Sequence, residues 1–291
     1  MVQTGPGGPG RFDVVMIVAL VDNGSLAPAA HANLRAAAGL LSSRVGRPVA
    51  AVSMKHSNRI PASDLDGVPA ATLAPWVRAQ LALGEREFLF VPFFVSPQGA
   101  IGSALRAEME ALSAAEGGFS FGFSPGLADG GVLVPIVASR VREALAGMRA
   151  DPKSAIILVD HGGPSPVSAA LRDSVASQVR LELGPSVGPL AAASLESPEG
   201  PEFAYNRPLF EEQLKAPGFD RGDVIVAPLF LSPGRHAGPA GDLARIAAAA
   251  EARSPGLKVH FTGLLGNHPL AVEALARGLA AARPGKAGAT R

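Results

Sequence analysis

Short apolar runs alternate along this chain with longer stretches of mixed character. In the first half, runs rich in β-branched and aromatic residues lie at 14–20, 48–54, 88–95 and 119–123, and they predict buried parallel strands. Stretches rich in alanine, leucine and arginine at 29–43, 70–83, 102–115 and 135–148 predict helices. Regular alternation of strand and helix is typical of an α/β fold whose parallel sheet is covered by helices on both faces.

The second half of the chain repeats the first. Apolar runs at 156–159, 189–195, 224–231 and 259–262 correspond to the four strands of the first half. Three sequence pairs also match in order, at offsets of 136–141 residues: VDNGSLAP at 21–28 with VDHGGPSP at 159–166, AVSMK at 51–55 with AASLE at 192–196, and VPFFVSPQGAIGSAL at 91–105 with APLFLSPGRHAGPAGDL at 227–243. An ordered internal repeat indicates a duplicated domain.

The repeat predicts the domain organisation. We expect two tandem α/β domains, at 13–150 and 151–285, with the boundary near Asp151 and Pro152. Each is expected to contain a four-stranded, mainly parallel sheet with helices on both faces. The Gly/Pro-rich segment 1–12 and residues 286–291 are expected to be tails, with the first of them disordered.

The two halves differ in the residues that follow their strands. The C-terminal half carries His161, Glu196 and His236 where the N-terminal half carries Asn23, Lys55 and Ala100. In open α/β sheets, ligands bind at the C-terminal ends of the strands. A single histidine or glutamate there is more often structural than functional, but three differences that all favour one half indicate a site in that half.

These residue types suit a metal centre. Two imidazoles and a carboxylate are appropriate ligands for a borderline divalent metal such as Fe²⁺, Co²⁺ or Ni²⁺. A neutral imidazole also accepts a proton at physiological pH. Gly162 and Gly163 leave room beside the backbone at His161, and Ser232-Pro233-Gly234 shapes the loop that leads to His236.

Composition excludes several other classes. The chain has no cysteine, so thiolate metal sites, iron–sulfur clusters and thiol nucleophiles are ruled out. Its net charge is only +1, which does not call for nucleic acid or an anionic membrane as a partner. The apolar runs are strand-length, shorter than the roughly 18 residues that a membrane span needs. The G-x-G-x-x-G from Gly5 to Gly10 precedes the first strand, so it does not fit a dinucleotide-binding turn.

The remaining histidines are weaker candidates. We expect His31 on a helix face and His260 in the core or at the edge of a strand. His56 follows a strand end near the crevice, where it is either a surface residue or a ligand contact. His268 opens the last helix and is a candidate for the rim of the site.

The motifs of the second half resemble a known family. VDHGGPSP, ASLESPE and PLFLSPGRHAGPAGDL are similar to motifs of the sirohydrochlorin and cobalt chelatases, the class II chelatase family, and LLGNHP at 264–269 resembles a weaker signature of the same family. The N-terminal copy keeps the frame but not the ligands, as in a two-domain form of the family with one degenerate half. Gly163 stands where the family usually has a serine, so one small hydrogen bond is in question.

The resemblance implies a function and a set of residues. It implies a lyase that inserts a divalent metal (Co²⁺, Fe²⁺ or Ni²⁺) into sirohydrochlorin or a related tetrapyrrole, with Co²⁺ or Fe²⁺ corresponding to cobalamin or siroheme biosynthesis. His161, Glu196 and His236 would be catalytic, and His161 and His236 would bind the metal. The metal ion is then a substrate, and no other cofactor is expected. Cations near the cleft would bind the ring's carboxylates, unless they are solvated surface charges; the candidates are Lys55, Arg207 and Arg235, followed by Arg59 and Arg172.

Other functions remain as alternatives. A non-catalytic carrier of metal or tetrapyrrole would use the same histidines. A dinucleotide-dependent oxidoreductase would need a Gly-rich turn after a strand, and a purely structural pair of domains would leave the asymmetry between the halves unexplained. We expect a cytoplasmic protein without nucleic-acid or membrane partners. The internal duplication can take the place of a homodimer, so a monomer is expected.

Overall fold

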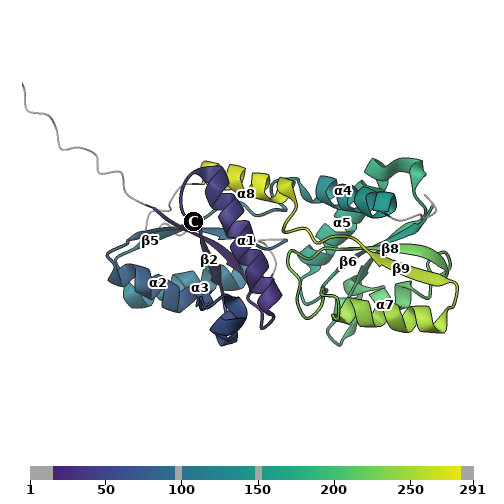
Figure 1. The fold of residues 1–291 in the computed structure, drawn as a ribbon, viewed down its shortest axis with the longest axis horizontal. Helices are drawn as coiled ribbons and strands as arrows, with labels where there is room; N and C mark the ends of the chain where they lie inside the picture. Colours follow the sequence, from purple (N-terminus) through teal and green to yellow (C-terminus); the bar gives the residue numbers. More distant parts are fainter. Residues whose placement is uncertain (1–15, 96–99, 148–152, 283–291) are drawn as a thin grey trace, which may run out of the picture.

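A computed structural model describes residues 16–95, 100–147 and 153–282 of the chain (Figure 1). Both tails, the Gly5 to Gly10 motif and the expected domain boundary at Asp151 and Pro152 lie outside these residues. Within them, the chain forms two parallel sheets, one from each half. Strand–helix alternation and the α/β class are therefore as the sequence predicts.

The N-terminal sheet has five parallel strands in the order β3-β2-β1-β4-β5. They are β1 (Ile17–Asp22), β2 (Ala50–Ser53), β3 (Ala71–Thr72), β4 (Glu87–Pro92) and β5 (Ser120–Phe123). The expectation of four strands was wrong here, because the segment predicted as one helix from residue 70 begins as the edge strand β3. A two-residue strand has too few positions to show a period of its own.

The C-terminal sheet has four parallel strands in the order β7-β6-β8-β9. They are β6 (Ala155–Asp160), β7 (Leu190–Ser194), β8 (Gly222–Pro228) and β9 (Leu257–Phe261). This is the order of the four strands β2-β1-β4-β5 in the first sheet. In the first sheet, β3 pairs with the outer edge of β2. In the second sheet, the corresponding contact is a single β-bridge between Ser194 of β7 and Leu209.

Helices cover both faces of each sheet. The α-helices are α1 (Pro28–Val45), α2 (Leu73–Ala82), α3 (Ala100–Glu116), α4 (Leu133–Gly147), α5 (Pro166–Leu183), α6 (Phe210–Gln213), α7 (Asp242–Arg253) and α8 (Pro269–Ala281). Short 3₁₀ turns are η1 (Ser57–Arg59), η2 (Ala62–Leu65), η3 (Gly184–Ser186) and η4 (Pro201–Asn206). Along β1, Val18 and Leu20 join one buried cluster while Ala19 and Val21 join another, as the two-residue period of a strand requires. None of the helices described here is long and apolar enough to cross a membrane.

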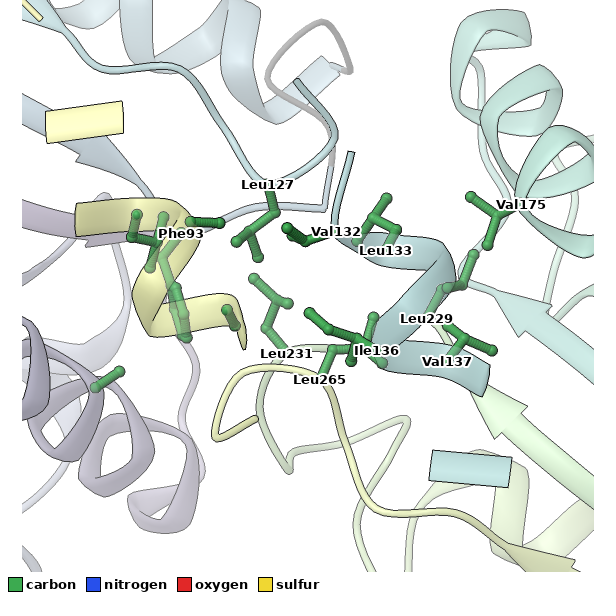
Figure 2. Packing of buried hydrophobic residues seen from close by; sticks show 14 of the residues in the cluster. Phe93, Leu127, Val132, Leu133, Ile136, Val137, Val175, Leu229, Leu231 and Leu265 are labelled. Atoms are coloured by element: carbon green, nitrogen blue, oxygen red, sulfur yellow. The ribbon is translucent and has the colours of Figure 1, made fainter. Parts of the chain in front are cut away.

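The last helix of each half packs on the other half. α8 lies against α1 of the N-terminal half, and α4 lies against α5 of the C-terminal half (Figure 1). Leu127, Leu133 and Ile136 meet Leu231 and Leu265 in one buried cluster that runs between the two sheets (Figure 2). The two halves therefore share a continuous hydrophobic core, and neither sheet is covered by its own half alone.

Backbone contacts at the strand ends repeat from half to half. The Met54 N–H donates to the Asp22 carbonyl at 2.8 Å, and the Leu195 N–H donates to the Asp160 carbonyl at 2.9 Å. The Phe93 N–H likewise donates to the Val21 carbonyl at 2.7 Å. The corresponding bond of the second half, from the Leu229 N–H to the Val159 carbonyl, has the same length. The duplication thus extends from sequence to the geometry of the ligand-binding edge.

Candidate metal centre

Three side chains meet at the C-terminal ends of the second sheet's strands. His161 directly follows β6, Glu196 follows β7, and His236 lies in the loop between β8 and α7. Since β7, β6 and β8 are neighbours in the sheet, their ends bring the three segments to one place. The structure therefore brings together the residues that the sequence selected.

The imidazoles face each other closely. The Nε2 atoms of His161 and His236 are 3.3 Å apart, and the ring planes are nearly perpendicular at 88°. A carboxylate oxygen of Glu196 lies 3.6 Å from the same Nε2 of His161. The side chains of His161 and Glu196 are 46% and 57% exposed, against 25% for His236, so the pair is open to solvent on one side.

The partners of the other ring nitrogens define the tautomers. Nδ1 of His161 lies 3.1 Å from the Gly162 carbonyl oxygen, which only accepts, so Nδ1 must donate. Nδ1 of His236 donates to a carboxylate oxygen of Asp242 at 2.7 Å. In the neutral rings, both Nε2 atoms then carry lone pairs. Two lone pairs directed at one point repel each other unless a proton or a cation lies between them.

The spacing suits a shared metal ion. Two imidazole nitrogens each about 2.1 Å from an ion, at a tetrahedral angle, lie about 3.4 Å apart. The observed separation of 3.3 Å between the two Nε2 atoms agrees with this value. Among the described residues, no set of three or more His, Asp or Glu side chains forms a ready metal-binding group, and the candidate centre is the imidazole pair with Glu196 beside it. Two protein ligands leave the other positions of an ion open to water or to a second chelator.

Asp242 is a site residue that the sequence reasoning missed. It is the first residue of α7 and contacts both His236 and Arg245. Partial burial raises the pKa of Asp242, but hydrogen bonds from His236 and Arg245 outweigh that effect and hold its pKa below the usual value. An ionised carboxylate behind an imidazole orients the ring and raises its basicity. The signal was an acid six residues after His236, at a position that the structure shows to be the start of α7.

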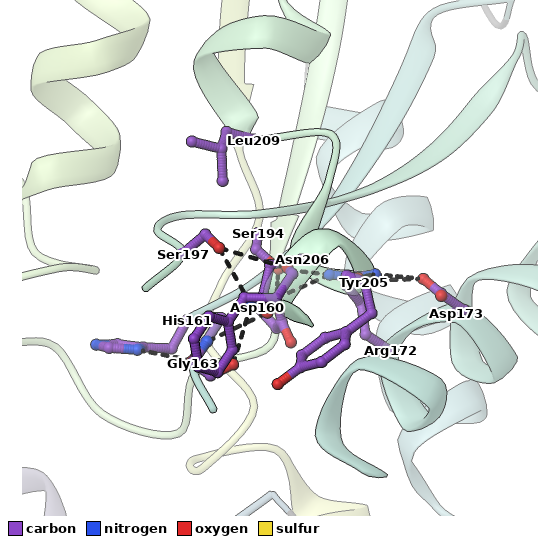
Figure 3. Close-up of polar contacts among 12 residues, drawn as sticks. Asp160, His161, Gly163, Arg172, Asp173, Ser194, Ser197, Tyr205, Asn206 and Leu209 are labelled. Atoms are coloured by element: carbon purple, nitrogen blue, oxygen red, sulfur yellow. Dashed lines mark hydrogen bonds and ion pairs between the residues drawn. The ribbon is translucent and has the colours of Figure 1, made fainter. Parts of the chain in front are cut away.

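Two glycines after His161 have separate structural reasons. Gly162 has φ +81°, and a Cβ there would strike the Glu196 carbonyl, so only glycine fits. Gly163 exchanges two hydrogen bonds with Asn206: its N–H donates at 3.2 Å, and its carbonyl accepts at 2.9 Å (Figure 3). The position where the resembling family usually has a serine is thus held here by its backbone.

The N-terminal half repeats this frame with different side chains. Gly24 has φ +86°, and a Cβ there would strike the Lys55 carbonyl, just as a Cβ at Gly162 would strike the Glu196 carbonyl. Asn23 is half-buried and Lys55 is exposed, while Ala100 is the first residue of α3. The strand ends of the first sheet therefore present an amide and an ammonium group where the second sheet presents an imidazole and a carboxylate.

The candidate substrate-binding cations fall into two groups. Arg235 is 85% exposed and lies 3.8 Å from Asp242, Arg207 is exposed and paired with Glu212, and Lys55 is exposed. Arg59 is also exposed. Arg172 is 2% exposed and bound to protein groups inside the domain. Its assignment as a substrate-binding residue was wrong, because the folded domain turns this side chain of α5 inward, where protein groups bind it.

The other histidines lie outside the pair. His31 is buried on α1, and His260 at the edge strand β9 pairs with Asp223 at 2.7 Å, both as expected. His268 caps α8 and is buried near Glu143 of α4, so its proposed place at the rim of the site was wrong. His56 is exposed at the end of β2, with a positive φ of 71°.

A hollow of about 420 Å³ adjoins the centre. It lies between α7 and the segments after β7, and its lining combines acids with arginines: Glu196, Glu211, Asp242, Arg235, Arg245 and Arg253. Since three acids and three arginines line it, the hollow favours neither cations nor anions by charge alone.

Comparison with solved structures finds proteins that share this architecture. The chain shares its fold with SirB from Bacillus subtilis solved with Fe³⁺ (TM-score 0.66, 14% identity, 91% of this chain and 94% of that one). It also shares it with CbiX, described as the terminal enzyme of siroheme biosynthesis in denitrifying bacteria (TM-score 0.59, 18% identity, 92% and 99%). A cobalt complex of SirB from Bacillus subtilis subspecies spizizenii matches similarly, with a TM-score of 0.65 and 14% identity over 91% and 94%. No curated protein sequence matches this chain.

These likenesses define the class of fold, a pair of chelatase-like α/β domains. The family match comes from the second domain: residues 155–282 match the model of the CbiX family. The match contains His161, Glu196 and His236 and excludes the N-terminal half. The family that the motifs indicated is thereby confirmed.

Proposed function

We propose that this protein is a metal chelatase that inserts a divalent metal into sirohydrochlorin or a closely related tetrapyrrole. The observation that carries the proposal is the pair of imidazole lone pairs converging at 3.3 Å within the CbiX-family half. Fe³⁺ and cobalt in the similar SirB structures support metal as the substrate of such a fold. Co²⁺ and Fe²⁺ are the proposed ions, which would assign the protein to cobalamin or siroheme biosynthesis; Ni²⁺ would indicate another modified tetrapyrrole.

The chemistry requires few protein groups. His161 and His236 hold the hydrated ion through Nε2 while ring nitrogens replace its remaining waters. Two pyrrole N–H protons leave the ring as the metal enters, so the products are the metallated ring and two protons. Once the ion has moved to the ring, the freed imidazoles can accept these protons. Metal, charge and protons balance without a redox step or a resident cofactor.

Glu196 and Asp242 have different parts in this proposal. Glu196 is 57% exposed and lies 3.6 Å from Nε2 of His161, so it can share the ion or pass protons to solvent. Asp242 stays on the far side of the His236 ring and does not touch the ion. It keeps the ring's proton on Nδ1 and thus its lone pair on Nε2.

The N-terminal half is proposed to bind substrate without binding metal. Asparagine is a poor ligand for a borderline metal, and a lysine ammonium repels a cation. Lys55, with Arg207 and Arg235 from the other half, would contact carboxylates of the tetrapyrrole. The two halves share one hydrophobic core, which suits a protein that works as a monomer. The proposed location of the protein is the cytoplasm.

An insertion assay tests the proposal. The absorbance of sirohydrochlorin is followed with Co²⁺, Fe²⁺ or Ni²⁺, with and without the protein. The protein should accelerate insertion of at least one metal, and His161→Ala or His236→Ala should return the rate to the spontaneous value. His260→Ala is the matched control, because His260 also pairs with an aspartate at 2.7 Å but lies on β9. Metal binding without acceleration would contradict a chelatase and favour a carrier.

A further inference from the structure

Arg172 is a buried cation that the proposed chemistry does not use. It lies on the inner face of α5, and its side chain is 2% exposed. Nε donates to Asp173 at 2.8 Å, Nη1 donates to the Ser194 hydroxyl, and Nη2 donates to the Tyr205 carbonyl at 2.9 Å (Figure 3). Nη1 also lies 3.5 Å from the Asp160 carboxylate, which accepts a hydrogen bond from Ser194 at 2.6 Å.

Two partners of Arg172 lie close in sequence to residues of the candidate centre, and a third is linked to it through Asn206. Asp160 directly precedes His161, and Ser194 precedes Glu196 by two positions. Tyr205 directly precedes Asn206 in η4, and Asn206 holds Gly163, two residues after His161. The guanidinium therefore joins three chain segments that meet only in the folded domain.

Further bonds connect these anchors. The Glu196 N–H donates to the His161 carbonyl at 3.1 Å, so the two site residues are joined through their backbones. His161 is thus fixed from Asp160 on one side and from Gly163 on the other, with Arg172 behind both. His236 is held independently by Asp242.

The N-terminal half lacks this arrangement. The proline that starts each helix is Pro28 in α1 and Pro166 in α5, and the sixth residue after it is Leu34 in one and Arg172 in the other. Leu34 is fully buried in the apolar core. The arginine therefore accompanies the half that carries the histidine and glutamate, while the half without them has a leucine.

We propose that Arg172 is a positioning residue that fixes the loops bearing His161 and Glu196, and so sets the geometry in which His161 meets the metal. The metal part of this inference rests on the proposed function. A bidentate or tridentate guanidinium fork is suited to the task, because its planar donors impose direction as well as charge. Lysine offers a single ammonium and cannot reach all three segments in the same way.

The first experiment measures Co²⁺ affinity by the visible absorption of the bound ion. Arg172→Leu, which installs the residue of the N-terminal half, should weaken Co²⁺ binding by about tenfold, the lower end of the effect of losing a direct partner of a metal ligand, because Arg172 acts on His161 through its loop. Arg172→Lys should recover only part of the loss. The matched control is Arg180→Leu: Arg180 is an exposed arginine of α5 that binds the carbonyls of Gly184, Val187 and Gly188, far along the helix from the site. Equal weakening in both variants would show a general effect on the domain and overturn the proposal.

The second experiment needs no metal. Amide hydrogen exchange of Gly163 and Glu196 should be faster in Arg172→Leu and unchanged in Arg180→Leu. Asn206→Ala, which keeps the buried charge but frees Gly163, should accelerate exchange at Gly163 and serves if Arg172→Leu does not fold. Unchanged exchange at both amides overturns the positioning role, whatever the protein does with metals. Faster exchange in a protein that neither binds nor inserts metal would leave the positioning role standing and refute the proposed function.

Discussion

The two histidines of the centre are held by different groups. His236 has an anionic partner in Asp242 and a side chain that is 25% exposed, whereas His161 has a neutral carbonyl partner and is 46% exposed. A carboxylate behind the ring raises the basicity of the distal nitrogen more than a carbonyl does. His236 is therefore expected to be the stronger ligand of the pair, and His161 the one that depends on its loops.

Substitution of Asp242 tests this difference. Asp242→Asn keeps the size and an acceptor for Nδ1 but removes the charge, so Co²⁺ affinity should fall by about 10–100-fold. The KM for the tetrapyrrole should change little, because Asp242 lies behind the ring. Metal titration and steady-state kinetics measure the two effects. Asp223→Asn beside His260 is the control and should leave both values unchanged.

Asp22 gives a pH-dependent prediction at the same scale. Burial raises its pKa from 3.8 to about 6, against the hydrogen bond from the Gly24 N–H that lowers it. Since the folded-state pKa is the higher one, the contribution of Asp22 to stability is full below pH 3.8 and is lost as the pH rises through about 6. At 1.36 kcal/mol per unit, the loss reaches at most about 3 kcal/mol at neutral pH.

Urea unfolding of Asp22→Asn at pH 4, 6 and 7.5 checks this sign. The amide that replaces the Asp22 carboxyl does not titrate. The free energy of unfolding of the variant should therefore be near that of the parent protein at pH 4 and should exceed it increasingly toward pH 7.5. Asp64→Asn, at an exposed aspartate of the same domain, is the control and should show no such trend. A gap that narrows as pH rises would refute the assignment.

At the scale of elements, the exchanged helices decide how the two halves depend on each other. α8 comes from the C-terminal end of the described chain but completes the layer beside α1, and α4 does the same beside α5. Arg44 of α1 and Glu273 of α8 add an exposed ion pair at 2.8 Å, which is worth little beside the apolar contact. The stability of each half therefore depends on a helix supplied by the other.

Leu275 of α8 is the residue that tests this dependence. It is 1% exposed in the shared core, so Leu275→Ala should cost about 2–5 kcal/mol of unfolding free energy. Amide protection should fall in α1, although Leu275 lies more than two hundred positions later in the sequence. Leu243→Ala in α7 is equally buried but belongs to a cluster of the second half alone. In that variant, protection of α1 should be kept while α7 loosens.

At the scale of the whole molecule, one half is expected to provide the chemistry and the other to help hold the substrate. Asn23→Ala should leave kcat within about twofold of the parent protein, because the amide is a poor metal ligand and is proposed to take no part in the chemistry. Lys55→Ala should raise the KM for the tetrapyrrole by about two- to fivefold, the effect of losing one exposed charge contact, with kcat kept. Steady-state kinetics with one metal decide this. An Asn23 variant as inactive as His161→Ala would refute the division.

Much of this molecule could be predicted from its sequence. The period of the apolar positions indicated the strands, and the repeat indicated that both halves share one strand order. Because parallel strands end at one edge, the residues after β6, β7 and β8 could be expected to meet, and His161, Glu196 and His236 do. These features depend on local pattern and on a general rule of sheet topology.

Other features were decided only by tertiary structure. The burial of Arg172, the contact of Asp242 with His236 and the exchange of α4 and α8 each join segments that carry no local sign of their partner. An arginine on a helix has the same sequence appearance whether it faces solvent or a buried aspartate, and an apolar helix face does not state which sheet it will cover. Sequence determined which side chains reach the edge of the sheet, whereas long-range packing determined what stands behind each of them, because partner choice depends on the shape and charge of surfaces that exist only after folding.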